Sequence, residues 1–259
     1  MEKEPSQIKV LITQNPFLAA TLIFSIALII ITFIFVGKIY QFRGEPNTIS
    51  VTGSTQQVIA SDVVVWQASF SRTVGVGSDE IKKGTAAIKA DASAITTYLH
   101  TSNIADSDIT FDPLNISPNY TYTTDKDGNN TQVFTGYTIS EGFTIQSSDI
   151  VNVGNAAKNS GSLIADGILF QSNAPQYFYS KLASLRISML GAATQDALGR
   201  AQKIADSSHA SLGKLRSASM GVVQITPEYS SDVSEDGEYD TSSIKKQVTI
   251  IVHEVFFVK

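Results

Sequence analysis

The chain is divided into two parts by its pattern of apolar and polar residues. Phe17 to Val36 is an unbroken apolar run without a charge, a glycine or a proline. At about 1.5 Å rise per residue, a helix over this run spans the roughly 30 Å hydrocarbon core of a bilayer. All of its faces are apolar, which disfavours the core helix of a soluble domain. The pattern therefore predicts one membrane-spanning helix.

A cleaved signal peptide is the alternative interpretation of this run. The run is longer than the roughly 7–15 apolar residues of a signal peptide, and no A-x-A site follows it. We therefore expect a short cytoplasmic tail (residues 1–16), a transmembrane anchor (17–40), a linker (41–46) and a head (47–259). Basic residues on the two sides of the run are nearly balanced, so the orientation rests on the short tail, which favours a head outside the cytoplasm.

The head begins with two segments of alternating apolar and polar residues, the pattern of half-buried strands. These segments are Thr48–Ile59 and Asp62–Val74. Only Ala60 and Ser61 separate them, so we expect a hairpin.

Five further strands are expected in the head. A turn-forming segment, residues 125–130, joins the strand Ile109–Thr123 to a strand that places Tyr137, Ile139, Phe143 and Ile145 on one face. The remaining three are Gly167–Phe178 (broken by Pro175), Lys214–Thr226 and Ile244–Val258. We expect the acidic loop between the last two strands, Pro227–Ser243, to be mobile.

Apolar residues at three- and four-residue spacing predict three helices in the head: Ser78–Ser102, Asp149–Ser160 and Ser180–Leu212. Ser78 is the expected N-cap of the first helix. Gly161 is expected to end the second, and Gly213 suits the position after the third. The third helix is rich in small residues and can lie close to a sheet. Its predicted apolar stripe is Ile187, Leu190, Thr194, Ala197, Ala201 and Ile204.

The resulting order of elements is β-β-α-β-β-α-β-α-β-β. It indicates the α+β class, with a largely antiparallel sheet and helices packed on it, preceded by one transmembrane helix. Hairpins outnumber crossovers, which disfavours a doubly wound nucleotide-binding fold. The net charge of −5 argues against nucleic acid as a partner. The absence of cysteine excludes disulfides, thiol catalysis and thiolate metal sites.

Two stretches of the head resemble the SIMPL domain, a family of bacterial envelopes. The first is Ile49–Ser54 followed by Ala60–Asp62 and the strand Val63–Phe70, where Ser61 stands in place of the family's usual proline. The second is an alanine-rich helix that leads into Leu212–Leu215. Its alanines are Ala192, Ala193, Ala197, Ala201 and Ala205. The resemblance covers nearly all of residues 47–259.

This resemblance implies an extracytoplasmic α+β domain, often secreted or anchored, which in some members assembles into large ring- or barrel-like oligomers. It also implies a loose link to envelope integrity and oxidative stress. The family has no catalytic residues to transfer to this chain, so we name none, and we expect no cofactor and no metal.

Possible metal, anion and calcium sites have weaker support in the sequence. His100, His209 and His253 have no partner at metal-ligand spacing. Gly75–Gly77 before a helix could bind an anion, but a simple turn explains it better. Two acidic groups could hold calcium, although solvated loops explain both. They are Asp125, Asp127, Asn129 and Thr131 in the first group, and Asp232, Glu235, Asp236, Glu238 and Asp240 in the second.

Aromatic residues gather in two places. The first group, Tyr120, Tyr122, Phe134 and Tyr137, would align across the hairpin at residues 125–130, and the second is Tyr177–Tyr179. Cross-strand packing is the simpler interpretation, and a contact between protomers is the alternative.

Two functional hypotheses follow. The first is a non-enzymatic protein of the cell inner membrane, crossing it once through Phe17 to Val36, with a periplasmic head that acts by self-assembly or by binding a partner protein. We expect a homo-oligomer and no nucleic-acid partner. The alternative is a hydrolase of an envelope component with an unrecognised carboxylate-based site, which would require two convergent carboxylates in a pocket.

Overall fold

A computed structural model describes residues 16–43, 47–124, 126–230 and 234–259. The apolar run forms the helix α2 (Pro16–Arg43), as predicted. Its segment Ala20–Lys38 is long and apolar enough to cross a membrane, and none of this segment is buried against the rest of the protein. The helix continues to Arg43, into the segment expected to be a linker.

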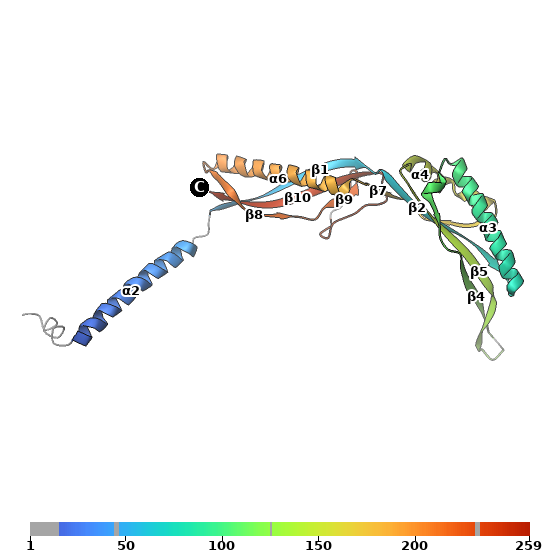
Figure 1. The fold of residues 1–259 in the computed structure, drawn as a ribbon, viewed down its shortest axis with the longest axis horizontal. Helices are drawn as coiled ribbons and strands as arrows, with labels where there is room; N and C mark the ends of the chain where they lie inside the picture. The colour runs from blue at the N-terminus through green and yellow to red at the C-terminus, as the bar shows by residue number, and fades with distance from the viewer. Residues whose placement is uncertain (1–15, 44–46, 125, 231–233) are drawn as a thin grey trace, which may run out of the picture.

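The strands of the head form two antiparallel sheets, each with its own core, which lie end to end in an elongated body (Figure 1). The sheet next to α2, which we call sheet A, has the order β1-β10-β8, and β9 also pairs with β10. The helix α6 (Leu182–Ser207) packs over β1 and β10. The strands are β1 (Thr48–Ala60), β8 (Leu212–Met220), β9 (Gln224–Pro227) and β10 (Lys245–Val258). Sheet A and α6 form the proximal lobe.

The second sheet, sheet B, has the order β3-β5-β2-β6, with β4 paired to β5 and β7 paired to β2. Its strands are β2 (Val63–Val74), β3 (Ile109–Phe111), β4 (Asn115–Thr124), β5 (Asn130–Ser147), β6 (Leu169–Ser172) and β7 (Gln176–Phe178). Its helices are α3 (Ser78–Thr101), the 3₁₀ turn η1 (Asp106–Asp108), α4 (Ile150–Asn159) and α5 (Gly161–Ala165). Together they form the distal lobe. This lobe is one continuous stretch of chain inserted between β1 and α6.

Trp66 lies at the centre of the distal core, fully buried and in edge-on contact with Phe143 at 5.6 Å between ring centroids. Arg72 on β2 forms a bidentate ion pair with Asp91 on α3, with both N–O distances at 2.7 Å. Because Asp91 is buried, this pair fixes α3 against sheet B as well as neutralising the carboxylate.

The predicted hairpin between β1 and β2 is wrong. All thirteen residues of β1 pair with β10, from Thr48 opposite Phe257 to Ala60 opposite Lys245, whereas β2 pairs with β5. Between the two strands, the Ser61 amide donates to the carbonyl of Ile244 and the Asp62 amide to that of Phe178. In the sequence, a two-residue break between strands has the same pattern whether the chain turns back in a hairpin or passes from one sheet into the next.

Three helix ends differ from expectation. Gly77, with φ of 122°, is the N-cap of α3, and Ser78 is its first residue. Gly161 begins α5 instead of only ending α4. After α6, His209 takes the left-handed conformation with φ of 57°, whereas Gly213 lies inside β8.

One further detail of the prediction is corrected, and another is confirmed. The expected strand over residues 109–123 is split into β3 and β4 around Pro113, which has no amide hydrogen for the ladder. The hairpin at residues 125–130 is confirmed, because β4 pairs with β5 as far as Thr124 opposite Asn130. Residue 125 itself lies outside the described residues.

The buried stripe of α6 has a four-residue period that differs from the predicted one. Ile187, Leu190 and Ile204 are exposed. The buried residues are Leu185, Met189, Ala193, Ala197, Ala201 and Ala205. Small side chains let the helix approach β1 so closely that a β-carbon on Gly53 would lie 2.2 Å from the carbonyl oxygen of Ala193.

We therefore expect Gly53→Ala to destabilise the proximal lobe by roughly 1–3 kcal/mol, the usual range for overpacking a core. Thermal or denaturant unfolding of the full chain measures this loss. The control is Gly199→Ala on α6, where a β-carbon would have nothing within 4 Å. This control should be neutral or stabilising by up to about 1 kcal/mol, since alanine favours a helix. Equal effects of the two substitutions would contradict the close packing.

Candidate functional site

The three histidines lie apart. His100 at the end of α3 contacts Asp106, with 2.6 Å between Nε2 and Oδ1. His253 on β10 contacts the hydroxyl of Thr52 at 3.0 Å, and His209 follows α6. No group of three or more His, Asp or Glu that could hold a metal occurs among the described residues.

The acidic loop expected to be mobile is anchored at its end by a buried ion pair. Lys246 is 2% exposed and its Nζ lies 3.2 Å from Oδ2 of Asp240, which is also buried. Nζ also donates to the carbonyl of Ser243 at 2.5 Å. Asp240 is thereby committed to a lysine, which removes it from the proposed calcium ligands. Asp232 of the same group, and Asp125 of the other, lie outside the described residues.

The pKa of Asp240 reflects opposing effects. Burial alone would raise it, but hydrogen bonds donated by Ser243, Ser242 and Lys246 outweigh burial and hold the pKa well below its usual range. Burial lowers the pKa of Lys246, and the carboxylate opposes this shift. The folded state therefore favours ionised Asp240.

The junction between the lobes is closed by a second carboxylate. Asp62, just before β2, accepts hydrogen bonds from the amide and the hydroxyl of Ser180, both at 2.6 Å. The bonds from Ser180 lower the pKa of Asp62. The two bonds join the two chain segments that connect the lobes, so Asp62 and Ser180 have a structural role.

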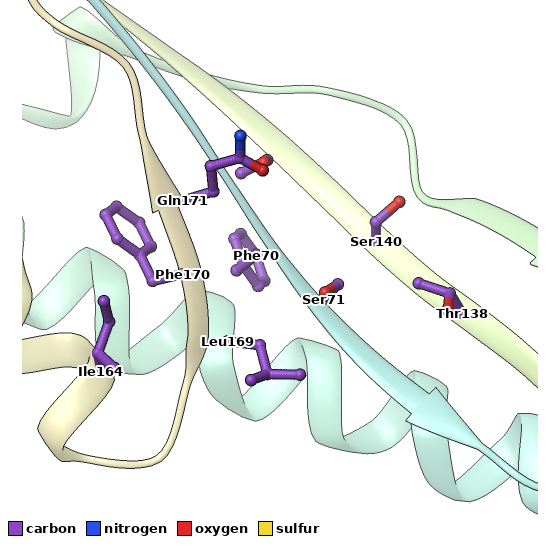
Figure 2. Close-up of a pocket in the computed structure, with 9 residues that line it drawn as sticks. Phe70, Ser71, Thr138, Ser140, Ile164, Leu169, Phe170 and Gln171 are labelled. Carbon is purple, nitrogen blue, oxygen red and sulfur yellow. The ribbon is translucent and has the colours of Figure 1, made fainter.

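A hollow of about 510 Å³ lies on sheet B where β2, β5 and β6 meet (Figure 2). Sequence patterns gave no indication of it. The hydroxyls of Ser71, Thr138 and Ser140 and the amide of Gln171 contribute its polar groups, and Ile164 and Leu169 contribute apolar surface. The full lining is Ser69, Phe70, Ser71, Thr138, Ser140, Ile164, Leu169, Phe170 and Gln171.

None of the described residues that line this hollow is an acid, a histidine or a lysine. Its serines therefore have no neighbouring base that could activate them as nucleophiles. The hollow could hold a small neutral molecule, but the lining gives no basis for chemistry on it.

One carboxyl group on sheet B is perturbed. Burial raises the pKa of Glu141 on β5, and the negative charge of Asp112 raises it further. Such a pair is what a carboxylate-based hydrolase requires. However, neither residue lines the hollow of Figure 2.

The aromatic groups pack as the simpler interpretation predicted. Tyr120 lies opposite Phe134 across the hairpin, with ring centroids 5.5 Å apart, and Phe134 contacts Tyr137 at 5.0 Å. Tyr122 remains exposed. In the second group, Phe178 contacts Tyr239 of the acidic loop at 6.5 Å, while Tyr179 packs against the proximal core.

The strand β8 is an exposed strand of the proximal lobe. Every residue from Lys214 to Met220 is exposed, including Leu215 at 48% and Met220 at 56%. Within the described residues β8 pairs only with β10, so its outer edge is open. The opposite edge of the sheet is protected, because Asp196 on α6 accepts a hydrogen bond from the Ser54 amide of β1 at 2.9 Å. An open edge is a natural site for another chain to pair.

Comparison with known proteins agrees with the resemblance in the sequence. The profile of SIMPL, described as a protein of unknown function (DUF541), matches residues 49–253. The chain is 28% identical over 126 residues to the 26 kDa periplasmic immunogenic protein of Brucella melitensis, and 27% identical over 126 residues to the protein of that name from Brucella abortus. Each match covers 48% of this chain and 48% of the relative, so the chain spans about half the length of the curated relatives it matches.

We expect Asp240→Asn to lower the free energy of unfolding by about 3–5 kcal/mol at neutral pH, because it leaves the Lys246 ammonium buried without its counter-charge. The wild type should also lose stability as the pH falls below about 4, where the unfolded chain takes up a proton that folded Asp240 resists. The variant should lack that part of the acid dependence. Denaturant titrations between pH 2 and 8 measure both effects.

The control is Asp236→Asn, an exposed carboxylate of the same loop. It should change stability by no more than about 0.5 kcal/mol. A similar loss in both variants would mean that general charge repulsion, and not the buried pair, anchors the loop.

Proposed function

The chain belongs to the SIMPL family, and from this membership we propose that it is a single-pass protein of the cell inner membrane whose periplasmic head acts by binding other proteins, including further copies of itself, and not by catalysis. The apolar helix α2 supports the anchor. The periplasmic relatives support the location of the head. A role in envelope integrity, including under oxidative stress, is part of this proposal.

The observation that carries the binding role is the open edge of β8. Its unpaired main-chain groups and exposed Leu215 and Met220 offer hydrogen bonds and apolar contact to an added strand. Soluble proteins usually protect such edges with charges, bulges or a covering helix. The strand β8 carries the charged Lys214 and Arg216 and is irregular opposite β10, but its exposed Leu215 and Met220 keep part of this edge apolar.

A hydrolase is the second candidate function. The raised pKa of Glu141 beside Asp112 favours it, since burial and a neighbouring carboxylate shift a carboxyl group in the direction that a general acid needs. The carboxylate pair lies outside the hollow of Figure 2, and this argues for the binding role.

The anchor is tested by membrane extraction and N-terminal sequencing. We expect the chain to stay in membranes washed with alkaline carbonate and to retain residues before Phe17, because α2 is long enough to span the bilayer. Release by carbonate, or a mature chain that starts beyond Val36, would contradict an uncleaved anchor.

The binding role is tested by thiol crosslinking. The chain has no native cysteine, so only the introduced thiol reacts. Ser217→Cys places one thiol on exposed β8, and Ser93→Cys places one on exposed α3 as the control. In purified full-length protein in detergent, we expect a short bis-maleimide to give dimers at Ser217→Cys at least tenfold more efficiently than at Ser93→Cys.

The proposal fails if the full-length protein stays monomeric at all concentrations, gives equal crosslinking at both positions, and retains no partner when purified from membranes. A loss of hydrolytic activity in Glu141→Gln, together with unchanged crosslinking, would favour the second candidate function.

A further inference from the structure

Charge is divided unevenly between the lobes. The segments of the proximal lobe (48–60, 182–227 and 245–259) contain eight lysines and arginines against three acids, a formal net charge of +5. The distal lobe (63–178) contains six basic residues against eleven acids, a net charge of −5. The acidic loop (228–244) adds six carboxylates near the junction, where Thr241 accepts a hydrogen bond from the Tyr177 amide. The head is therefore an electric dipole along its long axis.

The basic lobe is the one that adjoins the anchor. The amide of Val258 donates to the carbonyl of Asn47, just before β1, at 2.9 Å. Ser211 and Lys259 exchange main-chain hydrogen bonds at 2.8 and 3.0 Å. These contacts bring the first residue of the head, the start of β8 and the end of β10 to one end of the lobe, which lies next to α2 in Figure 1.

The exposed basic residues near this end include three on α6 and β8: Lys203, Lys214 and Arg216. We call them the basic end. None of the three forms an ion pair within the part of the chain that the structure describes. Of the acids on this lobe, Asp196 is paired with Arg200 at 2.8 Å and Glu254 is buried, so Asp206 is the exposed one that opposes them.

The chain length between anchor and head keeps this end close to the bilayer. Residues 44–47 separate the end of α2 from β1. These four residues reach at most about 14 Å when fully extended, and residues 39–43 of α2 add about 7.5 Å beyond the span Ala20–Lys38. The tether therefore keeps the end of the lobe within about 22 Å of the bilayer and lets it reach the surface, where an anionic bilayer attracts basic residues.

We propose that the basic end of the proximal lobe binds the anionic phospholipid headgroups of the membrane in which α2 is anchored. The acidic distal lobe is repelled from the same surface, so the head stands on the membrane with sheet B pointing away. This inference rests on the proposed anchoring of the chain and adds a second, electrostatic contact with the bilayer.

The test uses the full-length chain in nanodiscs of phosphatidylcholine alone or with about one third phosphatidylglycerol. A dye on Ser211→Cys reports the distance to labelled headgroups by energy transfer, and the same dye on Ser93→Cys reports the distal lobe. We expect higher transfer from Ser211→Cys in anionic discs than in neutral discs, with no increase from Ser93→Cys. In 1 M salt, where the Debye length is about 3 Å, the difference between lipids should vanish.

Charge removal separates the basic end from general effects. Lys203→Ser, Lys214→Ser and Arg216→Ser together should lower the ratio of docked to undocked heads in anionic discs by about a hundredfold, at roughly fivefold per charge. Lys82→Ser, Lys83→Ser and Lys89→Ser remove the same charge from exposed positions on α3 and should leave transfer from Ser211→Cys unchanged. Thermal unfolding by circular dichroism verifies that both triple variants remain folded.

Each outcome is informative. Transfer from Ser211→Cys that is independent of lipid charge, or lost equally in both triple variants, overturns this inference and leaves the anchor intact. A chain that neither type of disc retains overturns the anchoring itself, and this inference with it.

Discussion

The antiparallel pairing of β1 with β10 is the interaction on which the rest of the head depends. It joins β1, the first strand after α2, to β10 over the full length of β1. It makes β10 the central strand of sheet A and leaves β1 and β8 as edges. Because α6 packs mainly over β1 and β10, most of β8 stays exposed. The exposure of β8 is thus a consequence of which strands pair.

Local patterns in the sequence predicted most elements but not how they join. Alternation and helical spacing located the apolar helix, the strands around Trp66 and Ile139, and the helix over α3 because each depends on neighbouring residues. The partner of β1 could not be found this way, since β10 lies at the far end of the chain. The two-sheet arrangement and the hollow of Figure 2 depend on the same distant pairings.

The buried stripe of α6 shows a subtler limit. The spacing of residues predicted a stripe in which Ala197 and Ala201 are indeed buried, whereas Ile187, Leu190 and Ile204 are exposed. The expectation that small residues let this helix lie close to a sheet is confirmed. Where α6 crosses Gly53, the two backbones lie so close that the helix positions facing the glycine, Ala193 and Ala197, have room only for small side chains. The acidity of residues 227–243 suggested a mobile loop, whereas Asp240 and Lys246, six residues further on in β10, form a buried pair. The charges alone do not show that the fold buries both side chains together.

The insertion of the distal lobe into the proximal one has a consequence for how the protein forms. All the strands and helices of the distal lobe come from one uninterrupted stretch of chain, so it can reach its final arrangement as soon as that stretch is free. The proximal lobe must wait for β10, since contacts such as that of Thr52 with His253 join residues 201 positions apart. During synthesis β1 therefore has no partner strand until β10 has been made. Over that interval it is exposed to pairing with other chains, and a chaperone that shields newly made β1 would act there.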